Sequence, residues 1–283
     1  MIHIPILGSL ALAAGTIFQK LILIRKKIDI KSYTVLEFLA IILAMSPFVY
    51  FFWSIKQQAF EIHNIILFLL IVFLSIIANF LTFYSMKWEK VSNLEPAKVL
   101  EPLFVIVLAV IFSFISEELF SRDYKIILPG LIACFALIFS HIKKHHLSLN
   151  KYFIAAIFGS FFFAVELILS KYILEFYSPI SFYFTRCIAI FLIVFIIFRP
   201  KIKKLAKNTK LHIVGVGISW ATYRVLMYYG YISLGVVSTT LLLMLGPVFI
   251  YIFAWKFLKE KLNWKNIVAA FVIVGCVLYA TLM

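Results

Sequence analysis

The sequence predicts an all-α integral membrane protein, and two observations lead to that fold class. Of the 283 residues, 64% are hydrophobic and 14% are charged, and the mean hydropathy is +1.07. This composition lies far outside that of soluble globular domains. The apolar residues are also gathered in blocks of about 20, the length of a helix that crosses a bilayer. We therefore expect a multi-pass protein integral to the cell (inner) membrane.

Ten apolar blocks follow one another along the chain, and we expect each block to form one transmembrane helix. An even split gives five helices to each half and leaves no room for a soluble domain between them. The blocks are Ile4–Ile24, Tyr33–Trp53, Ile65–Met86, Val91–Ile115, Tyr124–His141, Tyr152–Ser170, Ser178–Phe198, Leu211–Tyr231, Val236–Phe257 and Trp264–Leu282.

The two halves resemble one another, which indicates an internal repeat. Pro102 matches Pro247, and Gly8 matches Gly159. Because five is an odd number, the second copy enters the membrane from the opposite side. Many secondary transporters use such inverted repeats to alternate access to a midplane site. The predicted repeats are 1–142 (helices 1–5) and 150–283 (helices 6–10).

Basic residues in the loops predict the orientation in the membrane. One set of loops carries 19 lysines and arginines, whereas the opposite set carries four. Positively charged loops face the cytoplasm in membrane proteins. The loop Arg199–Lys210 is therefore predicted to be cytoplasmic and both termini external. Since these charges lie between spans, the net charge of +15 does not indicate nucleic-acid binding.

The fourth block carries charges where a lipid-facing helix would carry none. Glu95, Lys98 and Glu101 are three residues apart, so they share one side of a helix. Ionisable groups within a membrane normally face a protein interior or a water-filled cavity. Two interpretations stay open: the lining of a transport pathway, and an ion pair that holds the helices together.

The other charged residues fall into two groups by depth. At about 1.5 Å of rise per residue, one group lies within about 5 to 10 Å of the basic side and the other at about 18 to 21 Å. Because isolated charges there are costly, we expect each group to interact and to close one end of a pathway. The expected gating residues are Lys20, Glu37, Glu95 and Lys98 in the first group, and Glu166 and Arg186, together with Arg224, in the second.

Helices 3 and 8 carry matching stripes that predict the cavity wall. Asn79 lies on a stripe of one helix face, and Trp220 and Arg224 lie on the equivalent stripe of the other. Helix–helix packing is the alternative interpretation of such stripes. Glu101 lies near the midplane, and aromatic rings could stack on the ligand. The candidate substrate-binding residues are Asn79, Glu101, Trp220, Tyr223, Arg224 and Tyr228.

Two copies of five spans, with an ordered set of short motifs, resemble the EamA-type transporters of the drug/metabolite transporter superfamily. The matching segments are Tyr84-Ser-Met, Glu101-Pro-Leu-Phe and Glu117-Glu118 in the first copy, and Phe184-Thr-Arg-Cys-Ile-Ala, Tyr229-Gly-Tyr, Gly246-Pro-Val-Phe and Lys259-Glu-Lys in the second. The resemblance implies a ten-helix secondary transporter whose central cavity is lined by helices 1, 3, 4, 6, 8 and 9. It also implies that amino acids, related metabolites or drugs are moved.

Three features depart from that pattern. The equivalent of Arg186 in the first copy is Glu37, and the fourth helix is unusually charged. Many relatives place both termini in the cytoplasm, whereas the loop charges of this chain predict the reverse, and we retain the prediction from the charges. Mixed charge in the cavity favours a small polar or zwitterionic metabolite, such as an amino acid. A drug or lipophilic-cation exporter is the alternative.

Other classes receive less support from the sequence. There is no nucleotide-binding loop of the form GxxxxGK[ST], no Ser/His/Asp set and no metal-ligand cluster, so we predict no enzyme, no cofactor and no metal. A membrane enzyme built on Lys98 and Glu101 would lack a nucleophile. A pore or a regulatory subunit is a further possibility. Glu37, Glu95, Glu101 and Glu166 are candidate proton carriers, because burial favours the neutral carboxyl group while ion pairing opposes it. The expected partners are therefore a small-molecule substrate, the lipid bilayer and protons as a candidate coupling ion, with no nucleic acid.

Overall fold

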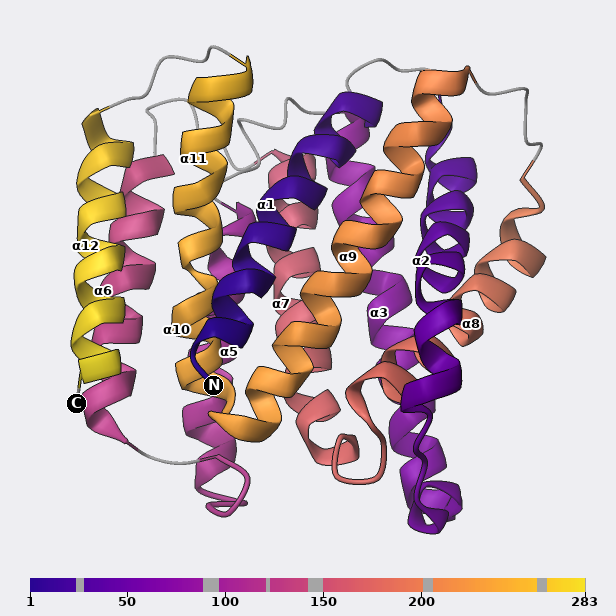
Figure 1. The fold of residues 1–283 in the computed structure, drawn as a ribbon, viewed down its shortest axis with the longest axis horizontal. Helices are drawn as coiled ribbons and strands as arrows, with labels where there is room; N and C mark the ends of the chain where they lie inside the picture. The colour runs from indigo at the N-terminus through magenta and orange to yellow at the C-terminus, as the bar shows by residue number, and fades with distance from the viewer. Residues whose placement is uncertain are drawn as a thin grey trace.

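The protein, seen here in a computed structural model, is a bundle of long helices in the part of the chain that the structure describes: residues 1–23, 28–88, 97–120, 123–141, 150–200, 206–258 and 264–282 (Figure 1). Besides helices, this part holds one isolated antiparallel bridge, between Ile55 and Tyr177. The helices are α1 (His3–Leu23), α2 (Ile30–Phe52), the short 3-10 helix η1 (Gln57–Phe60), α3 (Ile62–Trp88), α5 (Leu100–Ser113), α6 (Tyr124–His141), α7 (Lys151–Ile173), α8 (Pro179–Phe198), α9 (Lys207–Ser233), α10 (Val236–Leu243), α11 (Leu245–Leu258) and α12 (Trp264–Leu282).

Each apolar block of the sequence contains a helix, and an all-helical fold is confirmed for the described residues. The blocks Tyr124–His141 and Trp264–Leu282 coincide with α6 and α12. The block Leu211–Tyr231 is too short, because α9 extends over Lys207–Ser233 and its ends are polar. Residues 89–96, and with them Glu95 and the start of the fourth block, lie outside the described part.

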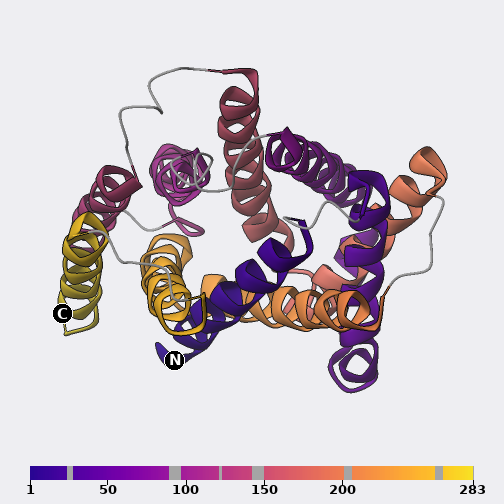
Figure 2. The ribbon, with the colours of Figure 1, turned by 90° about the horizontal axis from the view of Figure 1, so that it is seen from above.

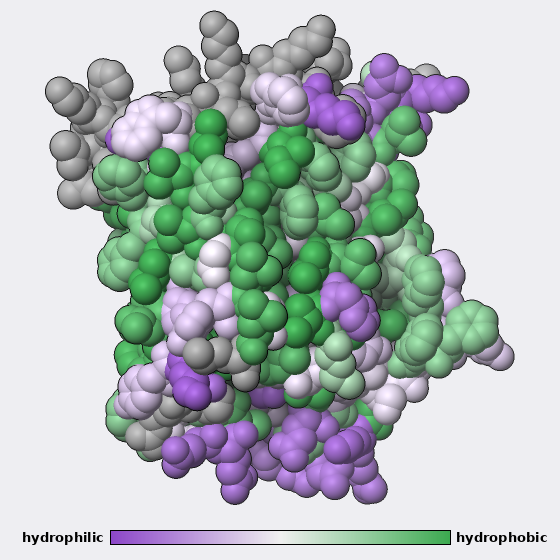
Figure 3. Space-filling model, turned by 60° about the vertical axis from the view of Figure 1, so that its left-hand side comes forward, coloured by the Kyte–Doolittle hydropathy of each residue, from purple (hydrophilic) through white to green (hydrophobic). Residues whose placement is uncertain are grey.

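Composition and length make these helices suited to a bilayer. Six helical stretches of the described chain are long and apolar enough to cross a membrane: Ile30–Phe52, Ile62–Ser85, Lys151–Ile173, Pro179–Phe198, Val236–Phe253 and Trp264–Leu282. Figure 3 shows a broad hydrophobic belt on one face, with hydrophilic residues at its lower end and at one upper corner. In a soluble protein such a belt would be an aggregation hazard, whereas lipid tails cover it at no cost.

The fourth and ninth predicted spans share one irregularity. The helical hydrogen-bond ladder is interrupted at Val99, just before α5, and at Met244, between α10 and α11. Each interruption lies three residues before a proline, Pro102 or Pro247. Proline has no backbone N–H and so leaves one carbonyl of the preceding turn without its helical partner. The two sites are 145 residues apart, which is the spacing of the two prolines themselves.

Helix starts follow local sequence signals. The Asn150 side chain accepts hydrogen bonds from the backbone N–H groups of Tyr152 and Phe153, at 3.1 and 2.8 Å, and so caps α7. Ser178 caps α8 in the same way, with Pro179 in the first turn. Gly235 precedes α10 with a φ of +83°, a backbone conformation that a residue with a Cβ atom rarely adopts.

Helices of the first half pack mainly on helices of the second half. The main pairs are α1 with α9, α3 with α7, α2 with α8, and α6 with α12 (Figure 2). The helices α9 and α2 lie close together, because a Cβ atom on Gly217 would lie 2.6 Å from the carbonyl carbon of Ala40. The pair α6 and α12 stands at one edge of the bundle. Figure 1 shows both chain termini at its lower end, where α1 begins and α12 ends.

Two loops from different halves are joined near this lower end. The Lys56 N–H donates to the Phe176 carbonyl at 2.8 Å, and the Ser178 N–H donates to the Ser54 carbonyl at 2.9 Å. The Ser54 N–H donates in turn to Ser181 Oγ at 2.8 Å. We call residues 54–56 and 176–178 the loop clasp. It connects the end of α2 to the start of α8.

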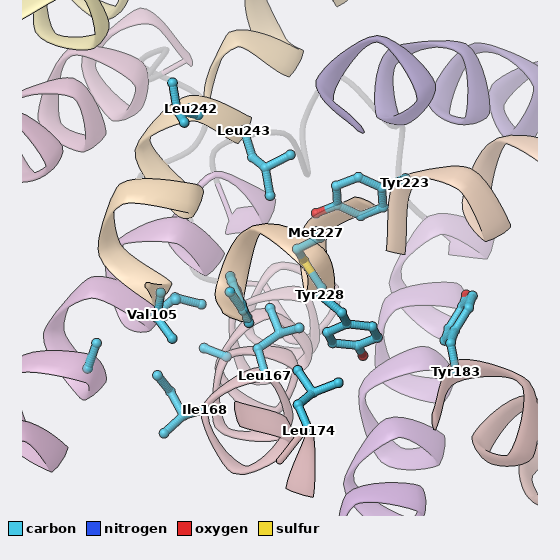
Figure 4. Close-up of a cluster of buried hydrophobic side chains, with 14 of the residues drawn as sticks. Val105, Leu167, Ile168, Leu174, Tyr183, Tyr223, Met227, Tyr228, Leu242 and Leu243 are labelled. Atoms are coloured by element: carbon cyan, nitrogen blue, oxygen red, sulfur yellow. The ribbon is translucent and has the colours of Figure 1, made fainter. Parts of the chain in front are cut away.

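The hydrophobic core lies where α5, α7, α9 and α10 meet. It includes Val105, Leu167, Met227 and Leu243, all buried (Figure 4). Tyrosines of α8 and α9 close one side of this cluster. Tyr228 is fully buried, which requires a polar partner for its hydroxyl group. That partner belongs to the site described next.

Candidate functional site

A cavity of about 230 Å³ lies within the bundle and is lined by residues of α1, α2, α3, α5, α6, α7, α8, α9, α10 and α11. Apolar side chains form most of its wall, and charged side chains of both signs interrupt them. The charged residues of the lining are Glu37, Lys98, Glu101, Arg186 and Arg224. A largely apolar pocket with a few convergent polar groups is the usual form of a small-molecule site.

Next to the cavity, one carboxylate is held by two arginines. Glu166 of α7 is completely buried, with 0% of its surface exposed. Its Oε1 accepts a hydrogen bond from Arg186 Nη1 of α8, and its Oε2 lies 3.7 Å from Arg224 Nη1 of α9. Arg186 Nη1 also donates to the Tyr228 hydroxyl at 2.6 Å. We call Glu166, Arg186, Arg224 and Tyr228 the arginine cluster.

Aromatic rings complete the surroundings of the two guanidinium groups. The Arg186 guanidinium carbon lies 4.9 Å from the centre of the Tyr183 ring. The Arg224 guanidinium carbon lies 5.6 Å from that of Phe163 and 5.7 Å from that of Tyr223. Cations are attracted to the faces of such rings, most strongly away from water. These contacts help to hold two buried positive charges beside a single carboxylate.

The arginine cluster is not saturated with hydrogen bonds. Glu166 Oε2, Arg186 Nε and Arg224 Nη1 have no hydrogen-bond partner among the described residues. The 3.7 Å between Arg224 and Glu166 is an ion-pair distance and too long for a hydrogen bond. Arg224 lines the cavity and therefore has donor capacity for an anionic group there.

Glu37 of α2 occupies another part of the cavity wall. It is 5% exposed, and its Oε2 has no hydrogen-bond partner in the described part of the chain. The Tyr33 side chain lies beside it, and Gln19 lies beside Tyr33. Asn79 of α3 lines the same cavity and donates to the Ser75 carbonyl at 2.8 Å. Glu37 Oε2 can therefore accept a hydrogen bond from a ligand in the cavity.

Trp220 and Tyr223 form an aromatic pair on α9 that lines the cavity. Their ring centres are 5.5 Å apart at an interplanar angle of 68°. Trp220 Nε1 is buried without a hydrogen-bond partner among the described residues. An indole N–H in that state is a donor for a ligand, because buried polar groups are normally paired.

The structure brings most of the predicted site residues to one cavity. Asn79, Glu101, Trp220, Tyr223 and Arg224 line it, as do Glu37, Lys98 and Arg186. Glu166 and Tyr228 are instead buried in the arginine cluster, where Tyr228 supports Arg186. The side chain of Lys20 and the whole of Glu95 lie outside the described residues.

Sequence reasoning missed Tyr33 and Gln19. Tyr33 precedes Glu37 by four residues and therefore lies on the same face of α2. That spacing is the signal that could have found it. Gln19 precedes Lys20 on α1 and gave no comparable signal, because its place beside Tyr33 depends on how α1 and α2 pack.

The fold and this site define a class: a multi-pass, all-helical membrane protein with a charged internal cavity. Residues 150–282 match the EamA-like transporter family, part of the drug/metabolite transporter superfamily. This match confirms the family resemblance noted from the sequence, and the family indicates a membrane transporter.

A solved structure supports the same fold over nearly the whole chain. It is described only as "Crystal structure of protein" and is similar with a TM-score of 0.70 at 15% sequence identity, over 98% of this chain and 95% of that one. At this identity the likeness concerns the fold alone. No curated protein sequence matches the chain.

Proposed function

We propose that the protein is a secondary transporter that moves a small polar or zwitterionic metabolite, such as an amino acid, by alternating access. The observation that carries this proposal is the cavity, which lies inside the bundle and presents both signs of charge to a ligand. A substrate bound there would be separated from both solutions by the ends of the helices.

Inverted repeats would provide the two alternating states. We propose ten spans arranged as repeats over 1–142 and 150–283, related by a two-fold axis in the membrane plane. Their contacts support this arrangement: a Cβ atom on Gly159 would lie 3.4 Å from the Ala78 carbonyl oxygen, and one on Gly8 would lie 3.8 Å from that of Tyr223. Gly8 and Gly159 are repeat equivalents, as are Ala78 and Tyr223. The family match covers 150–282, which is nearly the second proposed repeat.

The mixed charges favour a polar substrate over a lipophilic cation. In this proposal Arg224 and Trp220 donate hydrogen bonds to an anionic group such as a carboxylate, while Tyr223 packs on the body of the substrate. Glu101 and Asn79 add polar contacts. A site for lipophilic cations would be expected to lack the two arginines, because like charges repel across a cavity that excludes water.

The arginine cluster supports a role in closing one end of the pathway. It joins α7, α8 and α9 through buried ion pairs, and the loop charges assign its end of the bundle to the outside. In the alternative state these pairs would hydrate as the helices separate. Each pair would then shift the equilibrium by about 1–3 kcal/mol. Protons are the candidate coupling ion, with Glu37 and Glu101 facing the cavity.

A counterflow screen tests the proposal. Vesicles that contain the full chain are preloaded with unlabelled amino acids, nucleoside-containing metabolites or drugs, and uptake of the labelled compound is followed. We expect saturable accumulation of at least one amino acid or similar zwitterion. Empty vesicles and the variant Glu118→Gln, an exposed glutamate, are the controls. Accumulation of drugs alone would favour the exporter alternative, and flux without saturation would indicate a pore.

A further inference from the structure

The proposed repeat relation gives each of the three charged members of the arginine cluster an equivalent in the first half. Arg186 corresponds to Glu37, and Arg224 corresponds to Asn79. Glu166 corresponds to Gly15, at the same spacing of 151 residues that relates Gly159 to Gly8. The equivalent position therefore holds one carboxylate, one amide and no third side chain. At these three positions the second half has two arginines and the glutamate that they share. The first half has Glu37, and neither of the other two positions is charged.

Gly15 leaves room that another residue fills. A Cβ atom there would lie 3.1 Å from Ser219 Cβ and 3.6 Å from Trp220 Nε1. Any longer side chain would displace the indole ring. The indole N–H, which has no hydrogen-bond partner in the described part of the protein, therefore stands near the position where the second repeat carries its carboxylate.

Glu37 has the properties of a carboxylate prepared for a cation from outside the protein. It is 95% buried, since only 5% of its surface is exposed, and it lines the cavity. Its Oε2 accepts no hydrogen bond from any described residue. Tyr33, which lies beside it, and Gln19, which lies beside Tyr33, are neutral. Leaving a buried carboxylate oxygen unpaired costs free energy. A ligand that donates a hydrogen bond to this oxygen recovers a large part of that free energy on binding.

We propose that Glu37 binds the ammonium group of the substrate. The bound amine takes the place that an arginine holds in the arginine cluster, and the substrate thereby completes an ion pair that the described residues do not supply to Glu37. This inference rests on the proposed transport function and adds the polarity of the bound molecule. Its amino group lies at Glu37, toward the end of the bundle where α2 begins, and its anionic group lies toward Arg224.

A matched set of three probes tests the assignment. Phenylalanine carries both charges, phenylalaninamide carries only the ammonium group, and N-acetylphenylalanine carries only the carboxylate. The aromatic ring suits the Trp220–Tyr223 pair. Binding to the purified full chain in lipid nanodiscs is measured by calorimetry, for the native protein and for Glu37→Gln, with Glu118→Gln as the control.

We expect Glu37→Gln to weaken phenylalanine and phenylalaninamide by about tenfold or more, as for the loss of a charge-assisted hydrogen bond. Binding of N-acetylphenylalanine should stay the same, and Glu118→Gln should change nothing. Equal weakening of all three probes, or of none, would overturn the assignment of Glu37. Failure of the native chain to bind any probe would instead count against the proposed substrate class.

If the native chain binds none of the probes, a second measurement tests the assignment of Glu37 without a ligand. Asn79→Arg introduces an internal cation at the position equivalent to Arg224. If the Glu37 carboxylate is open to a cation, this variant should raise the melting temperature of the purified chain by several degrees, and Glu37→Gln should abolish the rise. Lys20→Met is included as a control, because the sequence predicts Lys20 at the same depth as Glu37. A melting temperature that Asn79→Arg leaves unchanged or lowers, in both backgrounds, would contradict the inference.

Discussion

The arginine cluster and the Glu37 site, which the proposed repeat relates to one another, differ in how their buried carboxylates are paired. At the first, the Glu166 carboxylate has its partners within the protein, because it is shared by Arg186 and Arg224. At the second, Glu37 faces a cavity with an oxygen unpaired among the described residues. One buried carboxylate is thus paired by the protein, and the other has an oxygen left for a ligand.

This difference teaches how a duplicated fold can separate two tasks. A buried ion pair that is complete within the protein contributes to keeping helices together, provided that neither partner is removed. A lone buried carboxylate lowers the stability of the fold and favours a ligand that brings a cation. In the proposed repeat, three equivalent positions differ between the two situations.

The largest effect is expected from Glu166→Gln. This change removes the carboxylate that Arg186 and Arg224 share, and the loss of one partner from a buried pair costs about 3–5 kcal/mol. The purified chain should melt far below the native protein and lose its monodisperse size-exclusion peak. Glu37→Gln is the matched comparison and should leave the melting temperature the same or higher. Equal destabilisation by both changes would remove the contrast.

Reversal of one ion pair sharpens the comparison. Glu166→Arg and Arg186→Glu should each abolish transport and stability, whereas the double variant should recover part of both. Contacting residues couple by about 0.5–3 kcal/mol, so a partial recovery of melting temperature is expected. The readouts are thermal unfolding and counterflow uptake. A double variant no better than the worse single variant would argue that the pair does not act as a unit.

Arg224→Ala separates a gate from a permanent brace. If the cluster closes the pathway in one state, the loss of Arg224 favours the open state and raises cysteine labelling in the outer half of α9 from outside the cell. With a coupling of about 1–3 kcal/mol, the labelling rate should rise at least about fivefold. Cysteine at Tyr229 is a suitable probe. A well-folded variant with an unchanged labelling rate would falsify the gate and leave the brace.

The smallest effect is expected at the margin of the cluster. Lys171 Nζ of α7 donates to the Tyr231 carbonyl of α9 at 2.7 Å and so joins the same helices without a second charge. Lys171→Met keeps the length of the side chain and removes this bond, at a cost of about 0.5–1.5 kcal/mol. A small drop in melting temperature with unchanged transport is the expected result. A loss as large as that of Glu166→Gln would mean that the cluster is not what holds α7 to α9.

Much of this architecture could be predicted because hydropathy alone locates helices that must cross lipid. Trp264–Leu282, for example, was bounded correctly by composition. Depth along the helices also predicts that Glu166, Arg186 and Arg224 meet, since all three lie at a similar distance from the ends of their helices. Their contact is now visible, whereas their gating role stays a prediction.

Other parts of the site could not be predicted, because they depend on tertiary packing. Nothing in the sequence indicates that the Trp220 indole would lie against Gly15, or that Tyr33 would meet Gln19 across two helices. The loop clasp gave no signal either, because serine residues in loops have many possible partners. The helix interruption at Met244 could be predicted in part. Pro247 predicts that the helix is interrupted nearby, whereas the exact residue is known only from the structure.

The pairing of first-half helices with second-half helices has a consequence for how the protein is made. The chain emerges from the ribosome in order, so α1, α2 and α3 enter the bilayer before α7, α8 and α9 exist to receive them. During that interval Glu37 and Asn79 have no protein partner from the second half and must be sheltered by water, by lipid headgroups or by the insertion machinery. The bundle is completed only when the last helices arrive, and its halves are interleaved rather than stacked. Synthesis of the second half is therefore the final step of folding for the first.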